Sequence, residues 1–167
     1  MHLKNIDKSR LKQRQNRFTI AMIVGLLVLS LIFSQLYIAL WSTGGSNFWL
    51  NAAGVATAVF LLAGVINHIK HKPYMEEVVY VWRLKRELTQ IASKQKRLDA
   101  ALAKGEHSAY VVRYFQLHAS KHLYELEDNT VTLDDLNRQI REFDQLLAQQ
   151  GLQLSLEDYH TDLLEKL

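Results

Sequence analysis

Residues 18–69 contain no Lys, Arg, Asp or Glu, and this uncharged block constrains the fold more than any other feature of the 167-residue chain. A helix on the surface of a soluble protein needs a polar face, and a block of this length offers none. The block therefore predicts helices whose side chains contact lipid rather than water.

The first apolar stretch, Phe18 to Trp41, has 24 residues, and 14 of them are Leu, Ile, Val or Phe. As a helix it extends about 36 Å, which is enough to cross a hydrocarbon core of about 30 Å. Those 14 side chains favour insertion by roughly 4–8 kcal/mol. A cleaved signal peptide is rejected, because the run is too long and no small-residue cleavage site follows it.

The second apolar stretch, Phe48 to Ile66, extends about 28 Å as a helix, which is just long enough to span. It follows the first after the short turn-forming link "STGGSN". Such a short link makes the two helices antiparallel neighbours, so residues 18–69 are expected to form a transmembrane hairpin.

Small residues mark two possible packing faces on this hairpin. Ala21 and Gly25 lie four apart in the first stretch, and Ala52, Ala56 and Ala63 share a face of the second. They either contact the other span or pack against a second protomer, and the first interpretation is favoured.

The positive charges indicate the orientation of the hairpin. Residues 1–17 contain six Lys or Arg, residues 70–86 contain five, and the link contains none. Cytoplasmic flanks carry the excess of Lys and Arg, so both termini are expected in the cytoplasm. The basic arm 1–17 meets anionic lipid in this interpretation, and no nucleic-acid partner is needed to explain it.

A cytoplasmic domain is expected over residues 73–167. Pro73 is suited to the first position of a helix, which is predicted to continue to about Ala103. Residues that are apolar except for Gln95 then recur at spacings of three and four along a heptad seam: Val81, Leu84, Leu88, Ile91, Gln95, Leu98 and Leu102. The seam either joins two chains in a coiled coil or receives later helices in a bundle, and the bundle is favoured.

A helix over residues 108–126 is apolar on two sides and is expected to be sandwiched, and another helix after Thr132 has one apolar stripe formed by Leu133, Leu136, Ile140, Phe143 and Leu147. The second of these is expected to begin with a Thr132 cap and a Val131–Leu136 contact, and to end at Gly151. A short last helix is expected from Ser155 to Leu167. The predicted fold class is therefore all-α, a transmembrane helical hairpin followed by a cytoplasmic three- to four-helix bundle with a long membrane-proximal helix.

Candidate chemistry is sparse in this sequence. His118, His122 and Glu125 would share one helical face, the spacing that a metal site needs. The segment lacks the glutamate of the H-E-x-x-H motif, and a core histidine beside a flanking one is the favoured interpretation. The chain has no cysteine, and we find no phosphate loop and no convergent catalytic set. No catalytic residue and no cofactor are therefore predicted.

Three phrases resemble an uncharacterised family of bacterial inner-membrane proteins typical of gammaproteobacteria, a domain of unknown function. They are "GGSNFWLN", "KPYMEEVVYVWRLKREL" and "LYELEDNTVTLDDLN". The resemblance covers the basic arm through about Gln149 and implies a two-span membrane protein in a Gram-negative cell. It implies no activity, so no functional residue is carried over.

The expected function is that of a membrane-anchored, non-enzymatic interaction or scaffold protein. Its expected partners are the lipid bilayer, an unidentified protein at the cytoplasmic domain and, as a further possibility, a second copy of the chain. The alternative is a metal- or pH-responsive membrane regulator that uses the His118, His122 and Glu125 face. A transporter subunit ranks third, supported only by Gln35 and Asn51 in the spans.

Overall fold

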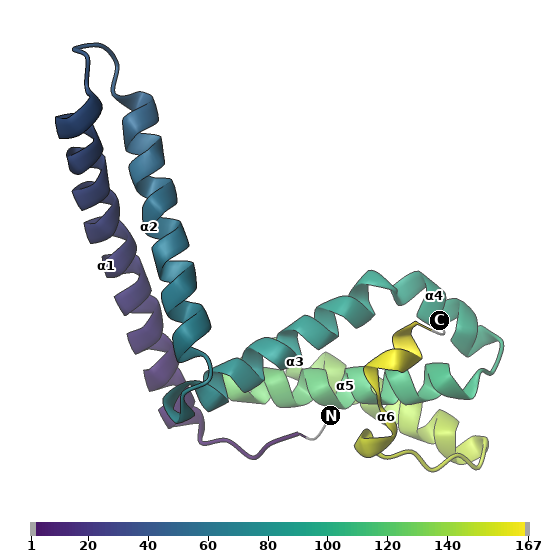
Figure 1. Ribbon diagram of the computed structural model, residues 1–167. Helices are drawn as coiled ribbons and strands as arrows, with labels where there is room; N and C mark the ends of the chain where they lie inside the picture. Colours follow the sequence, from purple (N-terminus) through teal and green to yellow (C-terminus); the bar gives the residue numbers. More distant parts are fainter. Residues whose placement is uncertain (1–2, 166–167) are drawn as a thin grey trace. The chain divides into compact units, whose positions relative to one another are not determined.

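The computed structural model describes residues 3–165, and within them it contains six α-helices, three short 3₁₀ turns and no strand. Of residues 3–165, 80% lie in α-helices or 3₁₀ turns, which confirms the all-α prediction (Figure 1). Packing divides it into two compact units. One unit holds residues 9–79, and the other holds residues 3–8 together with residues 80–165.

The first unit is a helical hairpin. Helix α1 (Lys8–Trp41) and helix α2 (Phe48–Ile69) lie side by side and antiparallel (Figure 1). Both are long and apolar enough to cross a membrane. They contain the two predicted spans, but α1 begins ten residues before Phe18 and α2 continues three residues past Ile66.

The contact between α1 and α2 depends on a close approach at Gly54. A Cβ atom added there would lie 2.5 Å from the backbone nitrogen of Ser34, so only glycine fits. Beside it, the Ser34 hydroxyl donates to the Asn51 carbonyl at 3.3 Å, and the Tyr37 and Thr57 hydroxyls bond at 2.9 Å. Polar groups on the inner side of the hairpin are thus paired within it.

The expectation that the alanine face of the second span contacts the first span was wrong. Ala52, Ala56 and Ala63 are exposed in the structure, whereas Gly54 and Ala58 on the other side of α2 are buried. Spacing shows that three alanines share a face, but it does not show which face meets the neighbouring helix.

The proline after α2 acts as the sequence predicts. Lys72 is extended, and Pro73 begins the 3₁₀ turn η1 (Pro73–Met75). An ion pair joins the residues just after this turn to the start of α1, with Arg14 Nη1 3.1 Å from Glu77 Oε2. The Arg14 guanidinium also donates to the Tyr74 carbonyl and lies over the Tyr74 ring, 4.9 Å from its centroid.

The predicted helix from Pro73 to Ala103 is wrong in one respect, because it is broken at Lys94. Helix α3 (Glu76–Ser93) ends there and helix α4 (Gln95–Ala103) begins immediately after it. The ammonium of Lys94 donates to the carbonyl of Leu164, which ties the break to the C-terminal segment. The heptad spacing continues across the break and therefore gives no sign of it.

Helix α5 (His107–Glu127) lies at the centre of the second unit and is covered on two sides, as its two apolar arcs predict. On one side Phe115, fully buried, stacks on Tyr159 with the ring centroids 3.9 Å apart. The Tyr159 hydroxyl donates to Glu87 of α3 at 2.6 Å. The heptad seam of α3 and α4 is buried or half-buried within the single chain, which supports the bundle over a coiled coil.

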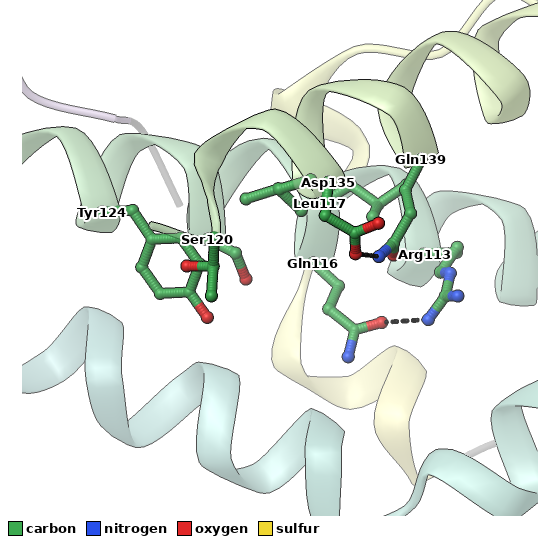
Figure 2. Close-up of a pocket in the computed structure, with 9 residues that line it drawn as sticks. Arg113, Gln116, Leu117, Ser120, Tyr124, Asp135 and Gln139 are labelled. Carbon is green, nitrogen blue, oxygen red and sulfur yellow. Dashed lines mark hydrogen bonds between the residues drawn. The ribbon is translucent and has the colours of Figure 1, made fainter. Parts of the chain in front are cut away.

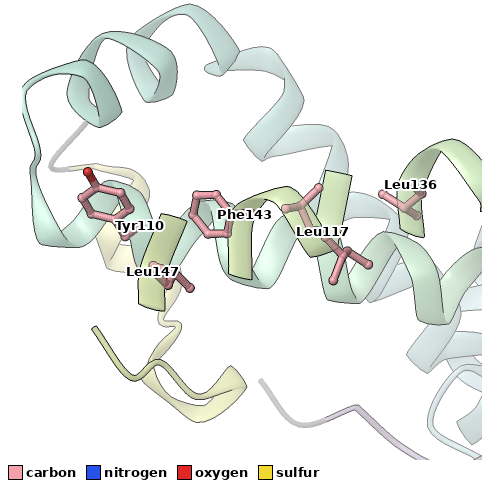
Figure 3. Close-up of a cluster of buried hydrophobic side chains, with 6 residues drawn as sticks. Tyr110, Leu117, Leu136, Phe143 and Leu147 are labelled. Carbon is pink, nitrogen blue, oxygen red and sulfur yellow. The ribbon is translucent and has the colours of Figure 1, made fainter. Parts of the chain in front are cut away.

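Helix α6 (Leu133–Gln149) covers the other side of α5 (Figure 3). The cluster there joins the predicted α6 stripe to two residues of α5: Tyr110, Leu117, Leu136, Ile140, Phe143 and Leu147. The predicted start of α6 is wrong in detail. Thr132 makes no capping hydrogen bond, and Val131 is 91% exposed rather than packed on Leu136.

The predicted last helix is also wrong where the structure describes it. Ser155 and Asp158 form the expected capping box, but only a 3₁₀ turn follows, η2 (Leu156–Asp158). The backbone is then extended at Tyr159 and His160 before the second turn, η3 (Thr161–Leu164). Extension at this point lets Tyr159 reach Phe115, so burial of one aromatic ring outweighs continuation of a short helix. Residues 166–167 lie outside the described part.

Candidate functional site

A polar groove of about 260 Å³ lies between α5 and α6 (Figure 2). Its lining is mostly polar, although the two helices meet through apolar stripes nearby. It is formed by Arg113, Gln116, Leu117, Ser120 and Tyr124 of α5 with Thr132, Asp135, Leu136 and Gln139 at and beyond the start of α6. The groove brings two helices and both signs of charge together.

The α5 wall of the groove is held by a short hydrogen-bond chain. Arg113 Nη1 donates to Gln116 Oε1 at 2.9 Å, and Gln116 Nε2 donates to Gln95 Oε1 of α4 at 3.0 Å. Two of these three side chains line the groove, and the third belongs to another helix. This series of hydrogen bonds orients the Arg113 guanidinium and leaves its other N–H groups available for a bound acceptor.

The α6 wall contains one carboxylate, that of Asp135. It accepts a hydrogen bond from Gln139 at 2.8 Å and pairs with Arg138. Ser120 forms no hydrogen bond to a basic side chain within residues 3–165. The groove can hold a polar group by hydrogen bonds and charge.

Sequence analysis missed this groove, although a signal for it was present. Arg113, Gln116 and Ser120 recur at spacings of three and four along α5, which is otherwise rich in apolar residues. Such a polar stripe on a covered helix predicts either solvent access or a polar partner. The matching wall from α6 could not be predicted, because pairing of helices depends on the tertiary structure.

His118 faces α6. Its ring lies 4.3 Å from the ring of Tyr114, measured between centroids. Burial lowers the pKa of His118, and the nearby carboxylate of Asp144 on α6 opposes that shift only in part.

His122 lies next to α3 and the N-terminal arm instead. Its ring meets the ring of Tyr80 edge-on, with centroids 6.2 Å apart, and its Nε2 is buried without a hydrogen-bond partner. Burial lowers the pKa of His122, while the carboxylate of Glu125 and a hydrogen bond to the Lys4 backbone act in the opposite direction.

The two histidines therefore contact different elements although they share one helix. Within the described chain, no three His, Asp or Glu side chains gather closely enough to hold a metal ion. The geometry gives no support to a metal site at His118, His122 and Glu125, which stays a prediction.

The N-terminal arm takes part in the same unit, which sequence analysis did not predict. The Lys4 backbone N–H donates to the Tyr80 hydroxyl at 3.0 Å. Lys8 Nζ lies 3.9 Å from Asp128 Oδ1, just after the end of α5. Nothing in the spacing of the arm's charges distinguishes these contacts from contacts with lipid headgroups.

Comparison with known protein families gives one match. The family described as "Protein of unknown function (DUF3087)" matches residues 1–164. Neither the curated proteins nor the solved structures contain a match to the chain. The family match confirms the resemblance to a domain of unknown function and extends beyond Gln149. Because it covers nearly the whole sequence, the chain belongs to the DUF3087 family.

Proposed function

We propose that this chain is a membrane-anchored, non-enzymatic interaction protein. In this proposal α1 and α2 span the inner membrane of a bacterium, and both termini lie in the cytoplasm. The helical unit of residues 80–165 then presents a surface to a protein partner.

The observation that carries the membrane proposal is the exposed apolar surface of the hairpin. In the most apolar 18-residue segment of each helix, only 6% of α1 and 11% of α2 is buried. A core helix of a soluble protein would be mostly buried. Phe60, for example, is 76% exposed. Water strongly disfavours so large a continuous apolar surface, and a lipid bilayer accommodates it.

The distribution of charge and aromatic residues supports the orientation. Lys and Arg flank the hairpin at the end where the chain enters and leaves it, while the link between the spans has none. Trp41, Phe48 and Trp49 cluster at the link end, where amphipathic rings suit a membrane interface.

The interaction role is supported by the chemistry of the helical unit. The groove between α5 and α6 offers oriented hydrogen-bonding groups, and the matching family names no activity. Exposed carboxylates on and after α6 add charge that a basic partner would meet: Asp134, Glu142, Asp144, Asp162 and Glu165. A protein partner that inserts a polar side chain into the groove fits these features best.

Reporter fusions to the full chain test the topology. An alkaline-phosphatase and a fluorescent-protein reporter at the C-terminus should indicate the cytoplasm, and the same reporters within residues 42–47 should indicate the opposite side. Periplasmic activity at the C-terminus would contradict the hairpin.

Photo-cross-linking in native membranes tests the partner. A photoreactive residue at Gln139 lies in the groove, and one at Gln145 lies on the exposed side of the same helix. We expect a defined protein adduct from position 139 and a much weaker one from position 145. Equal labelling from the two positions would count against the groove as the contact surface.

A second candidate function, a metal- or pH-responsive regulator, rests on the Nε2 atom of His122, which is buried and has no hydrogen-bond partner within residues 3–165, and not on a preformed metal cluster. Calorimetry of the detergent-solubilised full chain with Zn²⁺, Ni²⁺ and Mn²⁺ tests whether the protein binds a metal ion in this way. Stoichiometric binding that His118→Ala and His122→Ala each abolish would favour this candidate over the scaffold. Binding that survives both substitutions would place the metal elsewhere.

A further inference from the structure

Gln35 lies on the outward side of α1, where apolar side chains surround it. Its neighbours Leu31, Ile32 and Leu36 are all exposed, whereas Ser34 and Tyr37 turn toward α2. Unlike those two residues, Gln35 forms no hydrogen bond within residues 3–165. The Gln35 carboxamide is therefore left without a partner within residues 3–165, on the outer face of the hairpin.

The depth of Gln35 makes its position unfavourable in lipid. It precedes Trp41 by six residues, which corresponds to about 9 Å along the helix. If Trp41 lies at the interface, the carboxamide lies inside the hydrocarbon region, where lipid cannot satisfy its donors or its acceptor.

Gln35 also belongs to a regular seam. Residues on the outward side of α1 recur at alternating spacings of three and four, and all of them are exposed: Ala21, Val24, Val28, Leu31 and Gln35. This is the heptad spacing of packed helices, with a polar residue at one core position. Lipid could cover the apolar members of the seam, but it leaves Gln35 unsatisfied.

We propose that a second copy of the chain covers this seam, with α1 packed against α1 and the two Gln35 carboxamides hydrogen-bonded to each other. A carboxamide has both N–H donors and a carbonyl acceptor, so two copies related by a twofold axis can satisfy each other reciprocally. The proposal rests on the membrane-spanning function proposed above and names one partner for it. An ionised partner would be far harder to place at this depth.

Single-cysteine cross-linking of the full chain in native membranes tests the proposal, since the chain has no cysteine of its own. Val28→Cys and Leu31→Cys lie on the seam, whereas Leu27→Cys and Leu36→Cys are exposed positions at its flanks. We expect oxidation to give disulfide-linked dimers from the two seam positions and several-fold less from the flanking pair.

Substitution of Gln35 tests the role of the carboxamide in the Leu31→Cys background. Gln35→Leu should weaken association roughly 3- to 30-fold, the range that interhelical hydrogen bonds give in membranes. Gln35→Asn keeps an amide and should retain most of the dimer. Leucine favours insertion, so a loss of cross-linking with Gln35→Leu does not reflect failure to enter the membrane.

Three results would overturn the proposal. They are equal cross-linking from seam and flanking positions, unchanged cross-linking with Gln35→Leu, and dimers that form from Ala56→Cys on α2 instead. The membrane fraction and the topology reporters, measured on the same samples, distinguish this failure from failure of the spanning hairpin. A chain that spans correctly without seam cross-links contradicts only the pairing.

Discussion

The hairpin and the helical unit use similar apolar side chains in opposite ways. Phe60 of α2 is 76% exposed, while Phe115 of α5 is fully buried. In the helical unit, α5 is enclosed by its neighbours and apolar burial stabilises the fold. In the hairpin, α1 and α2 contact each other along one face, most closely at Gly54, and their outer faces remain exposed. Apolar content alone therefore does not build a core, because the surrounding solvent decides whether burial is favourable.

The two units also treat polar groups differently. In the hairpin, Ser34, Tyr37 and Thr57 form hydrogen bonds at the helix contact itself. In the helical unit the apolar contacts are separate from the polar groove, and most charged residues reach water. The difference is expected if lipid surrounds one unit, since interhelical packing and hydrogen bonds are then the main attractions between helices.

Removing one phenylalanine ring from each unit gives the largest expected contrast. Phe115→Ala should destabilise the helical unit by about 3–5 kcal/mol, because it empties a fully buried site and leaves Tyr159 without its stacking partner. Phe60→Ala should change the free energy of unfolding of the hairpin by less than about 0.5 kcal/mol. Denaturant unfolding of the full chain in detergent measures both effects: Trp82 fluorescence follows the helical unit after Trp41→Phe and Trp49→Phe, and Trp49 fluorescence follows the hairpin after Trp41→Phe and Trp82→Phe. Equal effects of the two substitutions would remove the distinction between the units.

Adding one methyl group at two glycines tests the hairpin contact. Gly54→Ala should separate α1 from α2 at a cost of about 1–3 kcal/mol, because the new Cβ meets the Ser34 backbone at 2.5 Å. Gly64→Ala has no atom within 4 Å of its new Cβ and should be neutral or slightly stabilising. Disulfide formation in a Gly25→Cys, Leu62→Cys background reports the separation. An undisturbed cross-link in Gly54→Ala would mean that the hairpin is held elsewhere.

Tyr159→Phe probes the polar edge of the helical core. The substitution keeps the ring that stacks on Phe115 and removes the hydroxyl that donates to Glu87, so a loss of about 1 kcal/mol is expected. Thr161 continues to donate to the same carboxylate oxygen, which limits the loss. Thermal unfolding measures it, and a loss as large as that of Phe115→Ala would show that the hydroxyl matters more than the ring.

Protonation of His122 should give the smallest effect. Burial lowers its pKa in the folded chain below the usual value near 6.5, so the unfolded chain binds the proton more readily. Stability should thus be complete above about pH 6.5 and should decline as the pH falls below that value. The groups that face the ring are Tyr80 of α3, Glu125 of α5 and Lys4 of the arm.

His122→Phe should flatten the pH dependence of unfolding below about pH 6.5. His118 contributes with the same sign, so His118→Phe should flatten the dependence as well. A pH profile that neither substitution changes would show that these rings titrate normally.

Local sequence determined much of this fold because its signals act over a few residues. The uncharged block predicted two long apolar helices, the extended Lys72 before Pro73 separated η1 from α2, and the α6 stripe through Ile140 and Phe143 identified a buried face. Periodicity shows which residues share one side of a helix, and that relation needs no knowledge of neighbouring helices.

The tertiary structure decided which neighbouring element each side of a helix contacts. The long helix is broken at Lys94, whose ammonium donates to the Leu164 carbonyl 70 residues later in the chain. The backbone at Tyr159 is extended, so that its ring reaches Phe115. The tertiary structure also turned His118 and His122 toward different elements and joined two half-polar faces into one groove. Each outcome depends on contacts between residues distant in the chain, whose combined burial outweighs local helix preference and leaves no trace in local spacing.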